Sequence, residues 1–239
     1  MNLEKKLLES ISDRESAVTG AWIGLTWTAI ESKYLGLSHT YNTPENIDIE
    51  NAGDLTSCKA TELASRILSW KPIEASIGVA TINSLLEPMG EKCNVKEFLR
   101  EKVRGKTVTF IGRFPFYDEI SPIARKSYLL ELHPVGEELP AFACEEILPK
   151  SDINVITGTT LINHSLQRLL ALGQNGINIV LGPTTPLSPI LFDFGAHIIG
   201  GIKVNNKTEV TKVIMQGVRM SKLLNGIERV CLFNSKMKF

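Results

Sequence analysis

The chain has 239 residues, 43% hydrophobic and 22% charged, and its formal net charge is zero because 26 basic residues balance 26 acidic ones. Proteins that bind nucleic acid non-specifically usually carry a basic excess, so we expect no nucleic-acid partner. No apolar run reaches the roughly 18–20 residues of a membrane-spanning helix, and residues 1–8 lack the apolar centre of a signal peptide. We therefore expect a cytoplasmic protein that makes no membrane contact.

The first hundred residues mix helical and extended patterns. Apolar spacing predicts helices over residues 3–11, 61–70 and 73–86, and β-branched and aromatic residues predict a strand pair or meander within 17–27 and 34–41. Residues 89–105 are charged and are interpreted as a connecting helix and turn. Together these segments predict a small α+β domain over residues 1–103, followed by a second domain over residues 104–239.

The second domain alternates short apolar runs with helix-start signals. The predicted strands cover residues 107–111, 128–132, 153–156, 177–181, 196–199 and 229–233. Expected helix starts lie at Ser121-Pro122, at Thr159 or Thr160, and at Ser188-Pro189, and Gly173 is expected to end the second of these helices. This alternation is typical of an α/β fold with a doubly wound, mostly parallel sheet, and it leaves the strand order open.

Two of the predicted strands end in turns that are rich in glycine and hydroxyl groups. Ligands of open α/β sheets bind outside the carboxyl ends of the strands, so these two turns predict one shared site. The candidate contacts are Thr157, Gly158, Thr159, Thr160 and Asn163 after one strand, and Gly182, Pro183, Thr184 and Thr185 after the other. The alternative is plain helix capping, which needs only one of the threonines.

A second group of candidates lies near the start of the second domain. Gly112 follows the first strand but lacks the other glycines of a dinucleotide-binding fingerprint, so no standard NAD or FAD site is expected. Gly112 either ends the strand or contacts a ligand, with Arg113 beside it, and Phe114 either stacks on a planar ligand or packs on the core. Glu131 lies in an apolar run and needs a partner, which is a ligand hydroxyl, an arginine or a helix N-terminus.

Asn83 is a polar residue in a helix that is otherwise expected to be buried. It either caps a neighbouring backbone group or faces the space between the two domains.

The sequence contains no His or Cys residues at the spacing that is typical of a metal site. The histidines (His39, His133, His164 and His197) are solitary, and the cysteines (Cys58, Cys93, Cys144 and Cys231) lie far apart. We therefore expect reduced, mostly buried thiols and no closed zinc site. An open metal site assembled from distant residues, such as His164, Glu131 or a cysteine, stays an alternative. Serine-hydrolase and P-loop motifs are absent.

Segments from both domains resemble a family of prokaryotic proteins described as "putative heavy-metal chelation". The matching segments are residues 78–83, 111–115, 152–163 and 182–189. The resemblance implies a small domain similar to the enolase N-terminal domain, followed by a Rossmann-like domain. It also implies a site in the interdomain cleft, which carries over onto Asn83, Gly112, Phe114, Glu131, Thr157, Gly158, Asn163 and Gly182. His164-Ser165 stands where the resemblance implies smaller or plainer residues, and Arg113 occupies a variable position, so either can alter ligand choice. Enolase chemistry is not implied, because it needs a (β/α)₈ barrel of roughly 250 residues.

Two functions follow from these observations. The first is a protein that binds a small molecule or a metal–chelator complex, with a metal ion as part of the ligand. The second is an enzyme that uses an adenosyl or nucleotide-like ligand such as S-adenosylmethionine, whose ribose Glu131 would hold. Asn, Thr and Gly recognise ligands more than they transfer protons, which favours binding. A homodimer is the default expectation for the assembly.

Overall fold

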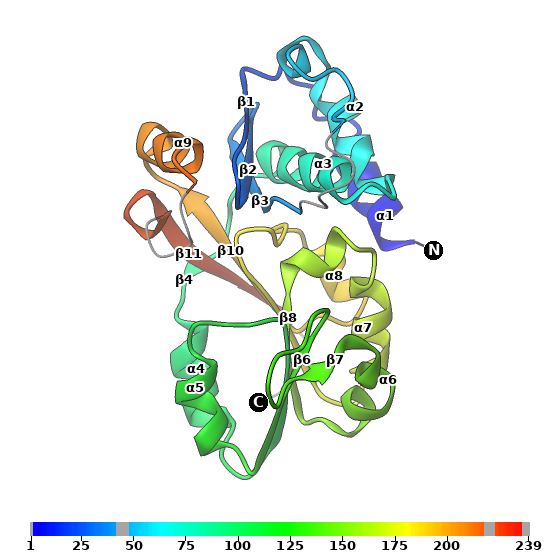
Figure 1. Ribbon diagram of the computed structural model, residues 1–239, viewed down its shortest axis with the longest axis vertical. Helices are drawn as coiled ribbons and strands as arrows, with labels where there is room; N and C mark the ends of the chain where they lie inside the picture. The colour runs from blue at the N-terminus through cyan, green and yellow to red at the C-terminus, as the bar shows by residue number, and fades with distance from the viewer. Residues whose placement is uncertain (1, 42–47, 218–222, 236–239) are drawn as a thin grey trace.

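The computed structural model describes residues 2–41, 48–217 and 223–235. Figure 1 shows a small sheet with its helices at one end of the molecule and a larger sheet below it, covered by helices on both faces. Every helix in these ranges is too short or too polar to cross a bilayer. The predicted class, a small α+β unit followed by a mostly parallel α/β sheet, is confirmed. The division at residue 103 stays a prediction.

The small unit is an antiparallel three-stranded sheet backed by one buried helix. Its elements are α1 (Leu3–Glu9), β1 (Gly20–Ile23), β2 (Trp27–Glu31), β3 (Leu35–His39), α2 (Ala60–Ser65) and α3 (Pro72–Leu85), with 3₁₀ turns η1 (Leu55–Ser57) and η2 (Arg66–Leu68). The predicted meander has the strand order β1-β2-β3. The Ser38 hydroxyl donates to the Ser76 carbonyl at 2.7 Å and joins β3 to α3.

The large sheet has eight strands in the order β4-β11-β10-β9-β8-β5-β6-β7. They are β4 (Glu91–Lys92), β5 (Thr107–Ile111), β6 (Lys126–Glu131), β7 (Leu139–Pro140), β8 (Ile153–Thr157), β9 (Ile177–Leu181), β10 (Ile198–Val204) and β11 (Ile227–Phe233). The strands from β10 to β7 are parallel, and β11 and β4 continue the sheet in antiparallel pairs. The parallel strands follow the order 3-2-1-4-5-6 that doubly wound dinucleotide-binding domains use.

Short helices cover the two faces of this sheet. Figure 1 shows α4 (Val95–Lys102) and α5 (Tyr117–Ile120) on one face, and α6 (Cys144–Ile147), α7 (Leu166–Leu172) and α8 (Ile190–Asp193) on the other. The remaining elements are α9 (Lys207–Met215) and the 3₁₀ turns η3 (Ser121–Ile123), η4 (Ala141–Ala143), η5 (Leu148–Lys150), η6 (Gly158–Leu161) and η7 (Leu224–Gly226).

The predicted helix starts need correction. Ser121-Pro122 does not begin a helix, because α5 ends there in a 3₁₀ turn and the chain then enters β6. The cap after β8 is Thr157 rather than Thr159 or Thr160, and it begins only the turn η6. α7 starts later, at Leu166, because His164 has a φ of 59° and interrupts the helix. Ser188 makes no side-chain cap for α8.

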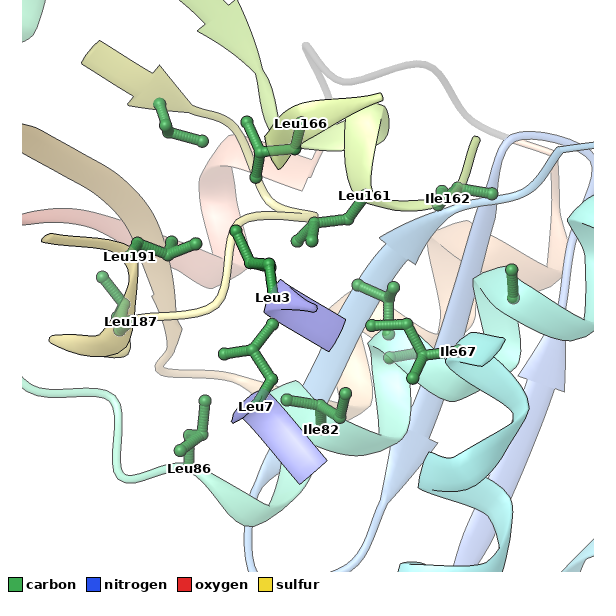
Figure 2. Packing of buried hydrophobic residues seen from close by; sticks show 14 of the residues in the cluster. Leu3, Leu7, Ile67, Ile82, Leu86, Leu161, Ile162, Leu166, Leu187 and Leu191 are labelled. Atoms are coloured by element: carbon green, nitrogen blue, oxygen red, sulfur yellow. The ribbon is translucent and has the colours of Figure 1, made fainter. Parts of the chain in front are cut away.

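One apolar cluster extends through both units. Leu3 and Leu7 of α1 are fully buried, and Figure 2 shows them between Ile67 and Ile82 of the small unit and residues of the large one. The large unit contributes Leu161, Leu166, Leu187 and Leu191. The Leu3 backbone N–H also donates to the Gln167 side chain at 2.9 Å. The first helix therefore fastens the small sheet to the large one.

We expect Leu7→Ala to lower the free energy of unfolding by about 2–5 kcal/mol, because it leaves a cavity in this shared cluster. Urea denaturation followed by circular dichroism measures the change. The control is Leu25→Ala, whose side chain is 77% exposed and should change stability by less than about 0.5 kcal/mol. Equal effects of the two variants would contradict the role given to α1.

Candidate functional site

A cavity of about 940 Å³ lies between the small sheet and the carboxyl ends of the parallel strands. Its wall includes most of the predicted contacts: Gly112, Arg113, Phe114, Glu131, Thr157, Thr159, Thr160, Asn163, Gly182 and Pro183. It lies over the boundary between β5 and β8, from which the chain continues toward both edges of the sheet. Crevices at such switch points are where open α/β sheets bind ligands. That these residues contact a ligand stays a prediction.

Two glycines end strands at this boundary in conformations that other residues adopt rarely. Gly112 after β5 has a φ of 95°, and a Cβ atom there would lie 2.8 Å from the Thr157 side chain. Gly182 after β9 has a φ of 123°. Both N–H groups bond a neighbouring strand, to the carbonyls of Leu130 and Gly200. Gly112 therefore does end its strand, and it also lets β5 and β8 approach closely at the cavity wall.

The polar groups after β8 largely bond one another. The Thr157 hydroxyl accepts from the Thr159 N–H at 3.4 Å, and the Thr160 hydroxyl donates to the Thr157 carbonyl at 2.7 Å. The Asn163 side-chain oxygen accepts from the hydroxyl and the N–H of Ser165, at 2.6 and 3.2 Å. The capping interpretation thus describes part of this turn. The same hydrogen bonds hold the turn in one conformation at the cavity wall.

Glu131 ends β6 with a side chain that is 17% exposed, and its charged partner is Arg113. The two side chains approach to 4.0 Å, while Arg113 Nε donates to Glu138 at 2.6 Å. This hydrogen bond lowers the pKa of Glu138. Of the three partners considered for Glu131, the structure therefore provides an arginine, and the guanidinium lies between two carboxylates at the cavity mouth.

The small sheet contributes an aromatic wall that the sequence analysis missed. Trp27, His39 and Tyr41 line the cavity, and consecutive rings meet edge to face at 5.7 and 5.6 Å. Burial lowers the pKa of His39. Burial, followed by the charge of Glu131, raises the pKa of Tyr41. The wall is therefore uncharged at neutral pH. The two-residue spacing of His39 and Tyr41, which places both on one face of an extended chain, was the available signal.

Four predicted contacts do not line the cavity. Asn83 donates to the carbonyls of Leu37 and Thr184, at 2.8 and 3.2 Å. The Thr184 hydroxyl accepts from the His39 N–H at 2.9 Å. Gly158 packs against buried Thr185, where a Cβ atom would come within 2.7 Å of the Thr185 backbone nitrogen. Asn83 thus bonds neighbouring backbone. The hydrogen bonds of Asn83 and Thr184 together join the loop after β9 to the small unit.

The expectation of four reduced thiols is wrong for one pair. Cys93 and Cys231 form a disulfide, with Cα atoms 5.8 Å apart, although 138 residues separate them in sequence. Pairing of β11 with β4 brings the two together. Cys58 and Cys144 are free thiols. Cys93, Cys231 and Cys144 all line the cavity, and burial raises the pKa of Cys144.

Within the described ranges, no group of three or more His, Cys, Asp and Glu residues is placed to hold a metal ion. His164, one candidate for an open metal site, lies away from Glu131: its Nε2 is 3.0 Å from the Ser69 carbonyl, and its ring packs edge to face on Trp70.

We expect stability to fall in weak acid partly because of His39. An unfolded histidine titrates near 6.5 and the folded one at a lower pH, so between these values only the unfolded state binds the proton and the free energy of unfolding decreases as pH falls. His39→Gln should reduce this decrease, as measured by urea denaturation between pH about 8 and about 5. An unaltered decrease in His39→Gln would refute the assignment.

The chain matches two family profiles described as "Putative heavy-metal chelation", DUF4213 over residues 5–86 and DUF364 over residues 94–233. A solved DUF364 protein of unknown function from Desulfitobacterium hafniense is 26% identical, with a TM-score of 0.86 over 97% of both chains. Another, from Pyrococcus horikoshii, is 17% identical, with a TM-score of 0.81 over 97% of this chain and 98% of that one. No curated protein matches the chain. The profile matches, which cover most of the sequence, place this protein in the DUF364 family.

Proposed function

We propose that the protein binds a small organic ligand with a flat, unsaturated part, in the form of its metal complex, inside the cavity between the two units. The observation that carries this proposal is the composition of the cavity wall. Trp27, His39 and Tyr41 supply uncharged rings from the small sheet, and the opposite unit supplies the charged pair of Arg113 and Glu131. Rings recognise flat ligand faces, and a few polar groups fix the orientation.

The proposal includes the metal for two reasons. The family is described by heavy-metal chelation. The described part of the chain brings no three metal-ligating side chains together, so a hard ion has no protein cage of its own there. An ion that arrives inside an organic chelator needs no such cage. The protein then has to recognise only the periphery of the chelator, for which rings, hydroxyls and a carboxylate suffice.

An enzyme that uses an adenosyl ligand is the second candidate, and the position of Glu131 favours it. The order of the parallel strands is the dinucleotide-binding one, and Glu131 ends the second of them, where an acid commonly holds ribose hydroxyls. Two features weaken the nucleotide form of this candidate, whose phosphates need free N–H groups, and leave S-adenosylmethionine, which has no phosphate, unaffected. The loop after β5 has a single glycine, and the helix that follows, α5, spans only residues 117–120. Few free N–H groups are therefore available there for phosphates.

Thermal unfolding in the presence of defined probes separates the two candidates. The probes are metal ions alone, the 2,2′-bipyridine complexes of the same ions, and S-adenosylmethionine. A probe at about 100 times its Kd stabilises the fold by roughly 2.7 kcal/mol, which for a chain of this size raises Tm by roughly 5–10 °C. We expect the largest rise with the complexes. A rise with S-adenosylmethionine alone would favour the enzyme, and no rise with any probe, together with no retained ligand in native mass spectrometry, would contradict both.

Substitutions at the polar positions test where the ligand binds. Glu131→Gln and Asn163→Ala should leave the fold intact. Each should raise the Kd of the probe that binds by about 3- to 10-fold, which corresponds to the loss of one hydrogen bond. Tyr41→Phe should raise the Kd by a similar factor. The matched control is Tyr34→Phe, because Tyr34 lies outside the cavity wall. Unchanged affinity in all three cavity variants would refute the site. Strong destabilisation of Glu131→Gln and Asn163→Ala would instead make these residues structural.

A further inference from the structure

The disulfide between Cys93 and Cys231 forms part of the wall of the cavity. We propose that this pair, once reduced, is a two-thiolate binding site for a soft, thiophilic d¹⁰ cation such as Cu(I), Ag(I) or Hg(II). This inference rests on the proposed function, because it names the class of metal that the same cavity handles. Two molecules of a small thiol would reduce the disulfide and leave as their own disulfide. The metal ion then displaces one proton from each cysteine.

The backbone holds the two cysteines in place without the covalent bond. Cys231 lies inside β11, opposite Gly200 of β10 and opposite Glu91 of β4. The Cys93 N–H donates to the Arg229 carbonyl at 3.4 Å. With Cα atoms 5.8 Å apart and held on adjoining segments of one sheet, the thiols remain neighbours after reduction. Such a preorganised pair binds a metal ion without first ordering the chain.

The pair borders the cavity at a point where β10 has no side chain. Residue 200, opposite Cys231, is glycine, and Gly200, Gly201 and both cysteines line the cavity. The Leu181 side chain occupies the space over Gly200, because a Cβ atom there would lie 2.4 Å from Leu181 Cδ2 and 3.6 Å from the Cys231 sulfur. An ion therefore reaches the Cys231 sulfur from the cavity side, with Leu181 beside it.

The number of ligands selects the metal. Zinc in closed sites takes four ligands, and among the described residues no group of three or more His, Cys, Asp and Glu that could hold a metal ion includes this pair. Soft d¹⁰ ions prefer thiolates and accept two of them in a linear arrangement. Lys96 and Arg229 line the same cavity, and Arg229 lies two residues from Cys231 on the same face of β11. Positive charge near a cysteine favours the thiolate form that a metal requires.

Silver binding to the reduced full-length chain tests the proposal. The protein is reduced, freed of reductant and dialysed against Ag(I) with glutathione as competitor, and bound silver is measured by mass spectrometry of the metal. We expect one equivalent retained by the wild type. Cys93→Ser and Cys231→Ser should each bind about 100-fold more weakly, because a single thiolate loses the intramolecular second contact. Oxidised protein should retain none until a thiol is added, and Zn(II) should not be retained.

The variant Cys58→Ser is the matched control, since it removes a free thiol outside the cavity wall and should keep full binding. Loss of silver in this control, or undiminished binding by Cys93→Ser with its fold verified by circular dichroism, would overturn the proposal. So would a disulfide that resists reduction until the protein unfolds. Glu131→Gln separates the two proposals. If this variant no longer binds the bipyridine complexes and still retains silver, the thiol site is independent of the site at Glu131. If the wild type retains silver but does not bind the complexes, only the function proposed above is refuted.

Discussion

The burial of α1 between the two units is the interaction on which the rest of the structure depends. Leu3 and Leu7 contact residues of the small unit on one side and of the large unit on the other, within one apolar cluster. A three-stranded antiparallel sheet with its helices has little core of its own. Because the cluster is shared, the small sheet is held above the strand ends of the large one, and the space between them becomes a cavity rather than open solvent.

The two walls of this cavity differ in chemistry. The wall from the small sheet presents rings that burial keeps neutral, whereas the large unit presents backbone turns, hydroxyls and an arginine between two carboxylates. A ligand that satisfies both needs a flat apolar face and a polar edge. The disulfide and Cys144 add sulfur to this wall. The wall of the cavity thus combines neutral rings, hydroxyls, charged groups and sulfur.

The sequence predicts the parts of the fold that local pattern determines. β5 and β9 have the predicted bounds, because buried parallel strands are continuous apolar runs. β4 and β7 were missed, since each is a two-residue edge strand without such a run. Most of the predicted strand-end residues line the cavity, and their contact with a ligand stays a prediction. The cysteine pair was missed because it depends on how segments distant in sequence pack. The aromatic wall was missed although the spacing of His39 and Tyr41 gave a local signal, because that spacing does not show which part of the chain the rings face.

The loop after β9 has two neighbours at once. Gly182 and Pro183 border the cavity, while the next residue, Thr184, accepts a hydrogen bond from His39 and meets Asn83. The loop therefore joins the cavity wall directly to the hydrogen bonds on which the small sheet rests. A single turn of the chain is thus shared between the lining of the cavity and the attachment of the amino-terminal unit.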